Sequence, residues 1–215
     1  LELAVREATA GQSGTLTIGA ISSALVDAIP PLVEELKQAH PDISIAVREI
    51  DSADAVTALQ AGELDFAFAR LQGELGSEIS TKLLGRDRLA VAMPLTHRLA
   101  ASRTVRLGQL VDEPFVMFMR RVSPVYFDSI IAGCQEHGFS PRVLHDVRSV
   151  AAQVALVGCG QGVALIPAGL KRLAPANVLV KPLKEAIEVV TTAVAWRRSS
   201  INPALKLALS TWRWA

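Results

Sequence analysis

The sequence has little cysteine and almost no net charge. Its two cysteines, Cys134 and Cys159, do not form a CxxC pattern, which favours reduced thiols in a cytoplasmic protein over a disulfide framework or a metal site. The 22 Lys and Arg residues nearly balance the 21 Asp and Glu residues, and the formal net charge is +1. A face basic enough to bind nucleic acid through its phosphates is therefore not expected. We predict that residues 1–215 do not bind DNA by themselves.

Long apolar runs and catalytic motifs are missing as well. The longest hydrophobic stretches, such as residues 189–196, are much shorter than the roughly 20 residues that a membrane span needs. The sequence contains no GxSxG elbow, HExxH helix or GKS/GKT loop, and its glycine-rich run GCGQG (158–162) precedes a predicted strand instead of joining a strand to a helix. The four histidines have no metal-ligand spacing. We therefore expect no enzyme, and neither a cofactor, a metal nor a membrane partner.

The sequence does contain a repeated strand–helix pattern, which is clearest in residues 15–45. An apolar run (16–20) predicts a buried strand, and apolar residues at helical spacing follow it. Because prolines at 30–31 interrupt one smooth helix, we expect a short helical turn from Ser23 and then a second helix that begins at the prolines. This is the opening β-α-β unit of an open α/β sheet, in which ligands bind beyond the carboxyl ends of the strands.

The same pattern continues along the chain and divides it into two lobes. Further strands are expected at residues 43–47, 64–69, 79–84, 88–93, 115–118, 142–147, 163–166 and 189–196, and further helices from about Ala53, Pro124, Val150 and Pro203. Residues 1–13 have the pattern of a helix end followed by a Gly/Ser linker, so we expect a further segment before Leu1. We predict lobe I at 14–96 together with 192–215 and lobe II at 97–191, so that the chain crosses between the lobes twice.

Serine occurs at four of the predicted strand-to-helix turns, as Ser22 with Ser23, Ser52, Ser123 and Ser149. Each one by itself is best interpreted as an ordinary N-cap of its helix. If the two lobes face each other across their strand ends, however, these hydroxyls and the free N–H groups of several helix N-termini meet at one place. Together they then predict a site for an anion such as a carboxylate.

Several arginines lie near these turns. Arg148 could add a bidentate contact to such an anion, but an ion pair with Asp146 at the surface explains its position equally well. Arg70 ends the strand predicted at 64–69, where a solvated arginine is slightly favoured over a ligand contact. Arg120 and Arg121 precede Ser123 in a loop, where arginines are more often solvated than bound to a ligand.

Four segments of the sequence resemble the effector-binding domain of LysR-type transcriptional regulators. They are TLTIGAISSALVDAIPPLVEELKQAHPDISI, ALQAGELDFAFAR, LLGRDRLAVAMPLTHRLA and HDVRSVAAQVALVGCGQGVALIPAGL. Within this family, the sequence is similar to the regulators of aromatic-compound catabolism. The resemblance implies a fold like that of the type 2 periplasmic binding proteins, with two Rossmann-like α/β lobes, two crossover strands and a small-molecule inducer between the lobes.

The resemblance also implies partners and site residues. It implies a helix-turn-helix domain and a linker helix before Leu1, through which alone the protein contacts DNA, and a homodimer that becomes a tetramer in the full-length protein. The inducer contacts that it implies are Ser22, Ser23, Ser52, Ser123, Pro124 and Tyr126, and Arg148 matches an arginine that is associated with the effector response. A periplasmic solute-binding protein for an anionic nutrient shares this fold and is the alternative interpretation. An export signal before residue 1 would favour that alternative, whereas a helix-turn-helix would favour the regulator.

Overall fold

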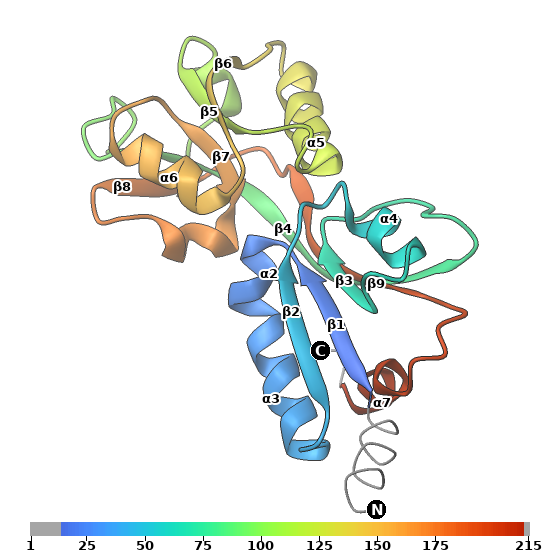
Figure 1. Cartoon of the computed structure of the whole chain (residues 1–215). Helices are drawn as coiled ribbons and strands as arrows, with labels where there is room; N and C mark the ends of the chain where they lie inside the picture. Colours follow the sequence, from blue (N-terminus) through green and yellow to red (C-terminus); the bar gives the residue numbers. More distant parts are fainter. Residues whose placement is uncertain (1–13, 213–215) are drawn as a thin grey trace, which may run out of the picture. The chain divides into compact units, whose positions relative to one another are not determined.

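The computed structural model describes residues 14–212, which fold as two α/β units (Figure 1). Unit 1 extends to Leu84 and resumes at Thr192, and unit 2 is the part of the chain between them. The α/β architecture with two lobes that the sequence predicts is thus confirmed. The linker predicted at 1–13 lies outside the described residues.

The chain passes from one unit to the other in two long strands, β4 (Ile79–Pro94) and β9 (Glu188–Arg197). The sequence predicts two separate strands where the structure has the single strand β4, because the polar residues 85–88 interrupt the apolar pattern without ending the strand. The later half of β4 pairs within unit 2, so the units divide after Leu84 and not at 96–97, where Pro94 and the polar residues behind it suggest a boundary.

In unit 1, β1 is the middle strand of three parallel strands, and helices connect them. The elements are β1 (Thr15–Ala20), α2 (Ser22–Asp27), α3 (Ile29–Ala39), β2 (Ser44–Glu49), α4 (Ala55–Gln60), β3 (Phe66–Ala69) and α7 (Pro203–Thr211). β1 pairs in parallel with β2 and with β3, and β3 pairs antiparallel with β9, so that Phe66 lies opposite Trp196. The carboxyl ends of β1, β2 and β3 therefore lie at one edge of the sheet, where open α/β sheets bind ligands.

The core of unit 1 follows the apolar pattern of the sequence. Leu16 and Ile18 of β1 are completely buried, and Leu32 and Leu36 of α3 belong to the same core cluster. The prolines at 30–31 lie in the first turn of α3, where a missing N–H group costs no helical hydrogen bond. The predicted short helical turn and second helix are confirmed as α2 and α3.

Asn202 joins the last helix to the sheet of unit 1. Its Oδ1 accepts the N–H of Ala204 at 2.9 Å, which makes it the N-cap of α7. Its Nδ2 donates to Asp65 Oδ1 at 2.8 Å and to the carbonyl oxygen of Thr15 at 3.0 Å. Asp65 also accepts the N–H of Thr17 at 2.8 Å. These bonds hold the start of α7 against β1 and the beginning of β3.

In unit 2, each strand of a parallel pair is followed by a helix, and a second group of strands pairs with β4. The elements are β5 (Pro114–Phe118), α5 (Pro124–Glu136), β6 (Arg142–Val147), α6 (Val150–Gly158), β7 (Ala164–Pro167), β8 (Val178–Pro182) and the 3₁₀ helices Leu107–Leu110 and Ala168–Leu173. β5 pairs in parallel with β6, whereas β7 and β8 each pair antiparallel with β4. The sequence predicts all of these strands except β8.

The glycine-rich run 158–162 forms the turn between α6 and β7. Gly160 and Gly162 have φ angles of 73° and 125°, which residues with a side chain rarely adopt. A Cβ atom on Gly162 would lie 2.2 Å from the carbonyl oxygen of Pro114, because the next residue, Val163, donates its N–H to that same oxygen at 2.9 Å. The run is a tight turn, as the sequence predicts, and not a dinucleotide-binding loop.

The two cysteines lie in different environments, and we expect them to react differently. Cys134 is buried in the core of unit 2, and this burial raises the pKa of its thiol to about 11, whereas Cys159 is exposed at the end of α6. Since only the thiolate is nucleophilic, a thiol reagent at pH 8 should label Cys159 rapidly and Cys134 only on unfolding. Mass spectrometry of the labelled protein measures this. Equal labelling rates in the native protein would contradict the packing of α5.

Candidate functional site

A buried arginine joins the carboxyl ends of the three parallel strands of unit 1. Arg70 follows β3 directly and is only 3% exposed. Its backbone N–H donates to Ser52 Oγ at 3.1 Å, and its Nη2 donates to Ser23 Oγ at 3.3 Å. Ser23 follows β1 and Ser52 follows β2, and both are buried. Arg70 thus links three turns that are far apart in the sequence, through its backbone and through its side chain. We call Ser23, Ser52 and Arg70 the Arg70 cluster.

The serines of unit 1 are not helix caps. Ser22 and Ser23 are the first residues of α2, whose N-cap is Ile21, and the N-cap of α4 is Asp54, two residues after Ser52. The N-cap interpretation is therefore wrong for all three serines, and the hydroxyls of Ser23 and Ser52 instead accept hydrogen bonds from Arg70. Because of these hydrogen bonds, interpreting Arg70 as solvated is also wrong. With six residues each, α2 and α4 are also too short to supply a strong helix dipole.

The chemistry of the Arg70 cluster suits a carboxylate. A serine hydroxyl that accepts a hydrogen bond keeps its own O–H to donate. The guanidinium group is charged at every physiological pH and presents its donors in the geometry of a carboxylate. An anion bound beside Arg70 would meet both the positive charge and the hydroxyl donors of the cluster. The sequence slightly favours a solvated Arg70 over a ligand contact because nothing in LDFAFAR shows that the strand end is buried.

In unit 2, Ser123 takes the N-cap position of α5 without capping it. Its side chain is fully buried, it makes no side-chain cap bond, and its Oγ has no hydrogen-bond partner among residues 14–212. Pro124 is the first residue of α5, as predicted. Tyr126 is buried, its hydroxyl donates to the carbonyl oxygen of Leu165 at 3.3 Å, and its ring meets Phe118 edge-on at 5.4 Å. Among the predicted site residues of unit 2, Ser123 therefore has the hydroxyl that can still form a hydrogen bond with a ligand.

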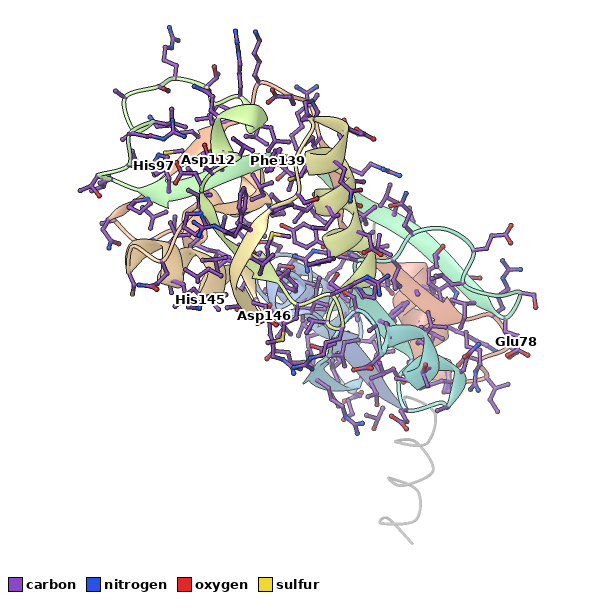
Figure 2. The ribbon with its side chains drawn as sticks, turned by 90° about the horizontal axis from the view of Figure 1, so that it is seen from above. Glu78, His97, Asp112, Phe139, His145 and Asp146 are labelled. Carbon is purple, nitrogen blue, oxygen red and sulfur yellow. The ribbon has the colours of Figure 1, made fainter. Side chains whose placement is uncertain are left out.

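The turn before α6 behaves as an ordinary helix start. Ser149 is its N-cap and accepts the N–H of Ala152 at 3.1 Å, which confirms the N-cap interpretation for this serine. Arg148 precedes it, directly after β6, and its side chain is exposed. His145 and Asp146 lie on the same strand (Figure 2), and His145 Nε2 lies 3.1 Å from Gln161 Oε1.

Gln153 is a buried polar residue that the sequence analysis does not single out. It lies on the inner face of α6 and donates from Nε2 to the carbonyl oxygen of Val116 at 3.0 Å. Val116 follows the irregularity in the pairing of β5 with β6, between Phe115 and Val116, where a carbonyl group can lose its sheet partner. A glutamine among the valines of α6 was the available indication in the sequence. We assign it a structural role.

The remaining arginines near Ser123 belong to the surface. Arg120 forms two hydrogen bonds with Asp128, at 2.8 and 2.9 Å, and both side chains are exposed. The hydrogen bond from Arg120 lowers the pKa of Asp128, and the same bond raises the pKa of Arg120.

No group of three or more His, Cys, Asp or Glu residues in the described part of the chain could hold a metal ion. Within the same part, no helix is long and apolar enough to cross a membrane.

Comparison with known proteins shows the family to which this chain belongs. The model of the LysR substrate binding domain matches residues 9–212. This chain belongs to that family. It is the effector-binding domain of a LysR-type regulator.

Individual LysR-type relatives agree with this assignment. The transcriptional regulator AlsR of Bacillus subtilis is 26% identical over 208 residues, which are 96% of this chain and 68% of AlsR. A variant of the effector-binding domain of BenM, a regulator of Acinetobacter baylyi, is 27% identical, with a TM-score of 0.79 over 92% of each chain. The BenM effector-binding domain with its effector benzoate is 26% identical, with a TM-score of 0.76 over 92% of this chain and 89% of that one. The predicted similarity to regulators of aromatic-compound catabolism is confirmed.

Proposed function

We propose that this LysR-type domain binds a small carboxylate effector and that the Arg70 cluster receives the carboxylate group. The observation that carries this proposal is the buried Arg70 at the carboxyl ends of three parallel strands, whose guanidinium group donates to Ser23 and whose backbone N–H donates to Ser52. Arg70 would supply the positive charge and the two hydroxyls would donate hydrogen bonds. Benzoate, the effector in the BenM structure, is itself a carboxylate, which supports this class of ligand.

We propose further contacts to the effector from one more serine of unit 1 and from two turns of unit 2. Ser22 begins α2 beside Ser23, and in unit 2 we propose Ser123, Pro124, Tyr126 and Arg148. The hydroxyl of Ser123 supports this best, because it is buried and makes no hydrogen bond within residues 14–212. Affinity measurements on Ser123→Ala and Arg148→Met test whether unit 2 takes part. Unchanged affinity in both variants would limit the carboxylate site to unit 1.

For the whole protein, we propose that the bound effector controls a DNA-binding domain outside this sequence. AlsR, an HTH-type transcriptional regulator, is longer than this chain, which covers 68% of it. A cytoplasmic homodimer, or a tetramer at full length, that contacts DNA only through the other domain would follow. A regulator of this kind needs no catalytic residues, and the relatives named above are regulators and not enzymes. The solute-binding alternative is not favoured.

Removing either serine hydroxyl of the Arg70 cluster should weaken effector binding. A thermal-shift screen of small carboxylates identifies the effector first, since a ligand at about 100 times its dissociation constant stabilises a protein by ~2.7 kcal/mol. Calorimetric titration should then show a loss of about 1.5–3 kcal/mol for Ser23→Ala and for Ser52→Ala, the range for hydrogen bonds to charged groups. Ser52→Ala should also lower the free energy of unfolding by about 1–3 kcal/mol, because the buried N–H of Arg70 loses its acceptor.

Ser210→Ala is the matched control for these two variants. It removes a hydroxyl of the same kind in unit 1, where Ser210 Oγ donates only to the carbonyl oxygen of Leu207 at the surface of α7. Its affinity should equal that of the unaltered protein. If both cluster variants bind as tightly as this control, the carboxylate lies elsewhere and the proposed site is wrong.

A further inference from the structure

A hollow of about 600 Å³ lies within unit 1, at a place that the Arg70 cluster does not share. Its walls are formed by the loop between β3 and β4, the first residues of β4 and the end of β9. Trp196 of this lining lies opposite Phe66 at the beginning of β3, whereas Arg70 follows the other end of that strand. The volume falls in the range of small-molecule sites.

One wall of the hollow is apolar. Trp196 is half-buried, and its ring meets Phe66 edge-on, with centroids 6.1 Å apart and an angle of 86° between the planes. Ile79 is buried beside it, and Leu75 is half-buried against the same core. The indole is therefore held in one orientation by the core of unit 1, with part of its surface in the hollow.

The other wall carries an oriented guanidinium group. The backbone N–H of Arg198 donates to the carbonyl oxygen of Glu78 (labelled in Figure 2) at 2.9 Å. The Nε of Arg198 donates to Ser80 Oγ at 3.0 Å. The ion pairs found within residues 14–212 involve Glu113 and Asp128, and none of them includes Arg198. The two terminal amino groups of this guanidinium are thus left to meet an anion that enters the hollow, as a fork that matches a carboxylate.

Trp196 and Arg198 line the same hollow. Trp196 is the next-to-last residue of β9, and Arg198 directly follows the end of that strand. The hydroxyls of Ser77 and Thr81 also line it. Glu74 is the one acidic residue of the lining, and its negative charge disfavours ligands that carry two negative charges.

We propose that this hollow is a second binding site of the domain, which takes a small monocarboxylate with an apolar body. Arg198 binds the carboxylate through its terminal amino groups, and Trp196 with Leu75 contacts the apolar body. Ser80 holds the guanidinium group in place before the ligand arrives, which reduces the conformational entropy lost on binding. The site shares no residue with the Arg70 cluster and does not depend on the function proposed for it.

The test follows the indole N–H resonance of Trp196 by NMR, assigned with Trp196→Phe, during titration with phenylacetate. A saturable shift of this resonance is expected, and phenylacetamide, which has the same shape without the charge, should not produce it. Arg198→Gln should weaken phenylacetate binding about 10- to 100-fold, the range for a lost hydrogen bond to a charged group. Glu74→Gln, the matched control on the same lining, should bind phenylacetate at least as tightly as the unaltered protein.

Three results would overturn the second site. They are the absence of a saturable shift with phenylacetate, equal binding of phenylacetamide, and unchanged affinity in Arg198→Gln. Titration of Arg70→Met separates the two sites of unit 1, because the response of Trp196 should persist in that variant. A response that disappears in Arg70→Met and survives in Arg198→Gln would assign the ligand to the Arg70 cluster and refute the proposal. Since the side chain of Arg198 is exposed, its replacement should leave the fold intact. The circular dichroism spectrum of Arg198→Gln should therefore equal that of the unaltered protein.

Discussion

Arg70→Met is expected to lower the affinity for a carboxylate effector by about 2–5 kcal/mol, or about 30-fold to several-thousand-fold, the cost of truncating one partner of a buried, hydrogen-bonded charge pair. Arg70 is 3% exposed, so little water replaces its contact with the ligand, and the carboxylate would be left without its countercharge. Methionine keeps much of the length of the arginine side chain and adds no charge. Calorimetric titration with the effector from the carboxylate screen measures the change.

Arg48→Met is the control for the Arg70 variant. Arg48 lies on β2 in the same unit, but its side chain is exposed, so its loss should leave effector affinity unchanged. The backbone N–H of residue 70 still donates to Ser52 in Arg70→Met, which keeps one of the two links between the turns. Effector affinity within a factor of about two of the control in a folded Arg70→Met protein would show that Arg70 does not bind the carboxylate.

Gly162→Ala should lower the free energy of unfolding by about 2–6 kcal/mol. A positive φ of 125° costs a residue with a side chain about 1–3 kcal/mol of strain. The new Cβ would also lie 2.2 Å from the carbonyl oxygen of Pro114, and such overpacking typically costs a further 1–3 kcal/mol. That oxygen accepts the N–H of Val163 at 2.9 Å, so the turn cannot move away without breaking this bond. Urea unfolding measures the loss.

Gly160→Ala separates strain from the steric clash in the same turn. Gly160 also has a positive φ, of 73°, but nothing lies within 4 Å of a Cβ placed there. Its replacement should therefore cost only the strain of the left-handed conformation, about 1–2 kcal/mol. Equal losses in the two variants would mean that the approach of Pro114 to Gly162 contributes nothing.

The strand–helix alternation of this chain could be predicted from the sequence because it depends on local rules. Apolar periodicity identified β1 and β6, and Pro203 behind Asn202 marked the start of α7, where Asn202 indeed caps the helix. The sequence predicts two strands in place of β4 because polar residues interrupt its apolar pattern, although they do not interrupt its backbone. Apolar periodicity reports which side chains are buried, and it reports strand continuity only where burial is continuous.

The serines show where local rules fail. Ser23, Ser52, Ser123 and Ser149 all fit the pattern of an N-cap, but only Ser149 makes the cap bond. In unit 1, the difference comes from Arg70, which is 47 residues from Ser23 and 18 from Ser52 in the sequence. A donor that the fold brings in from another strand competes with the backbone for a hydroxyl, and no window of the sequence around the serine contains that donor.

The sequence by itself determined the α/β class, the two passages between units, the absence of the known catalytic motifs and the resemblance to LysR-type regulators, because each depends on residue type, spacing and order along the chain. Only the tertiary structure decided that Arg70 is buried and organises Ser23 and Ser52, and that Trp196 and Arg198 line a hollow with the loop after β3. Burial and hydrogen-bond partnership depend on which distant segments meet. Strand pairing sets those meetings here, because β1, β2, β3 and β9 bring together residues that lie far apart in the chain.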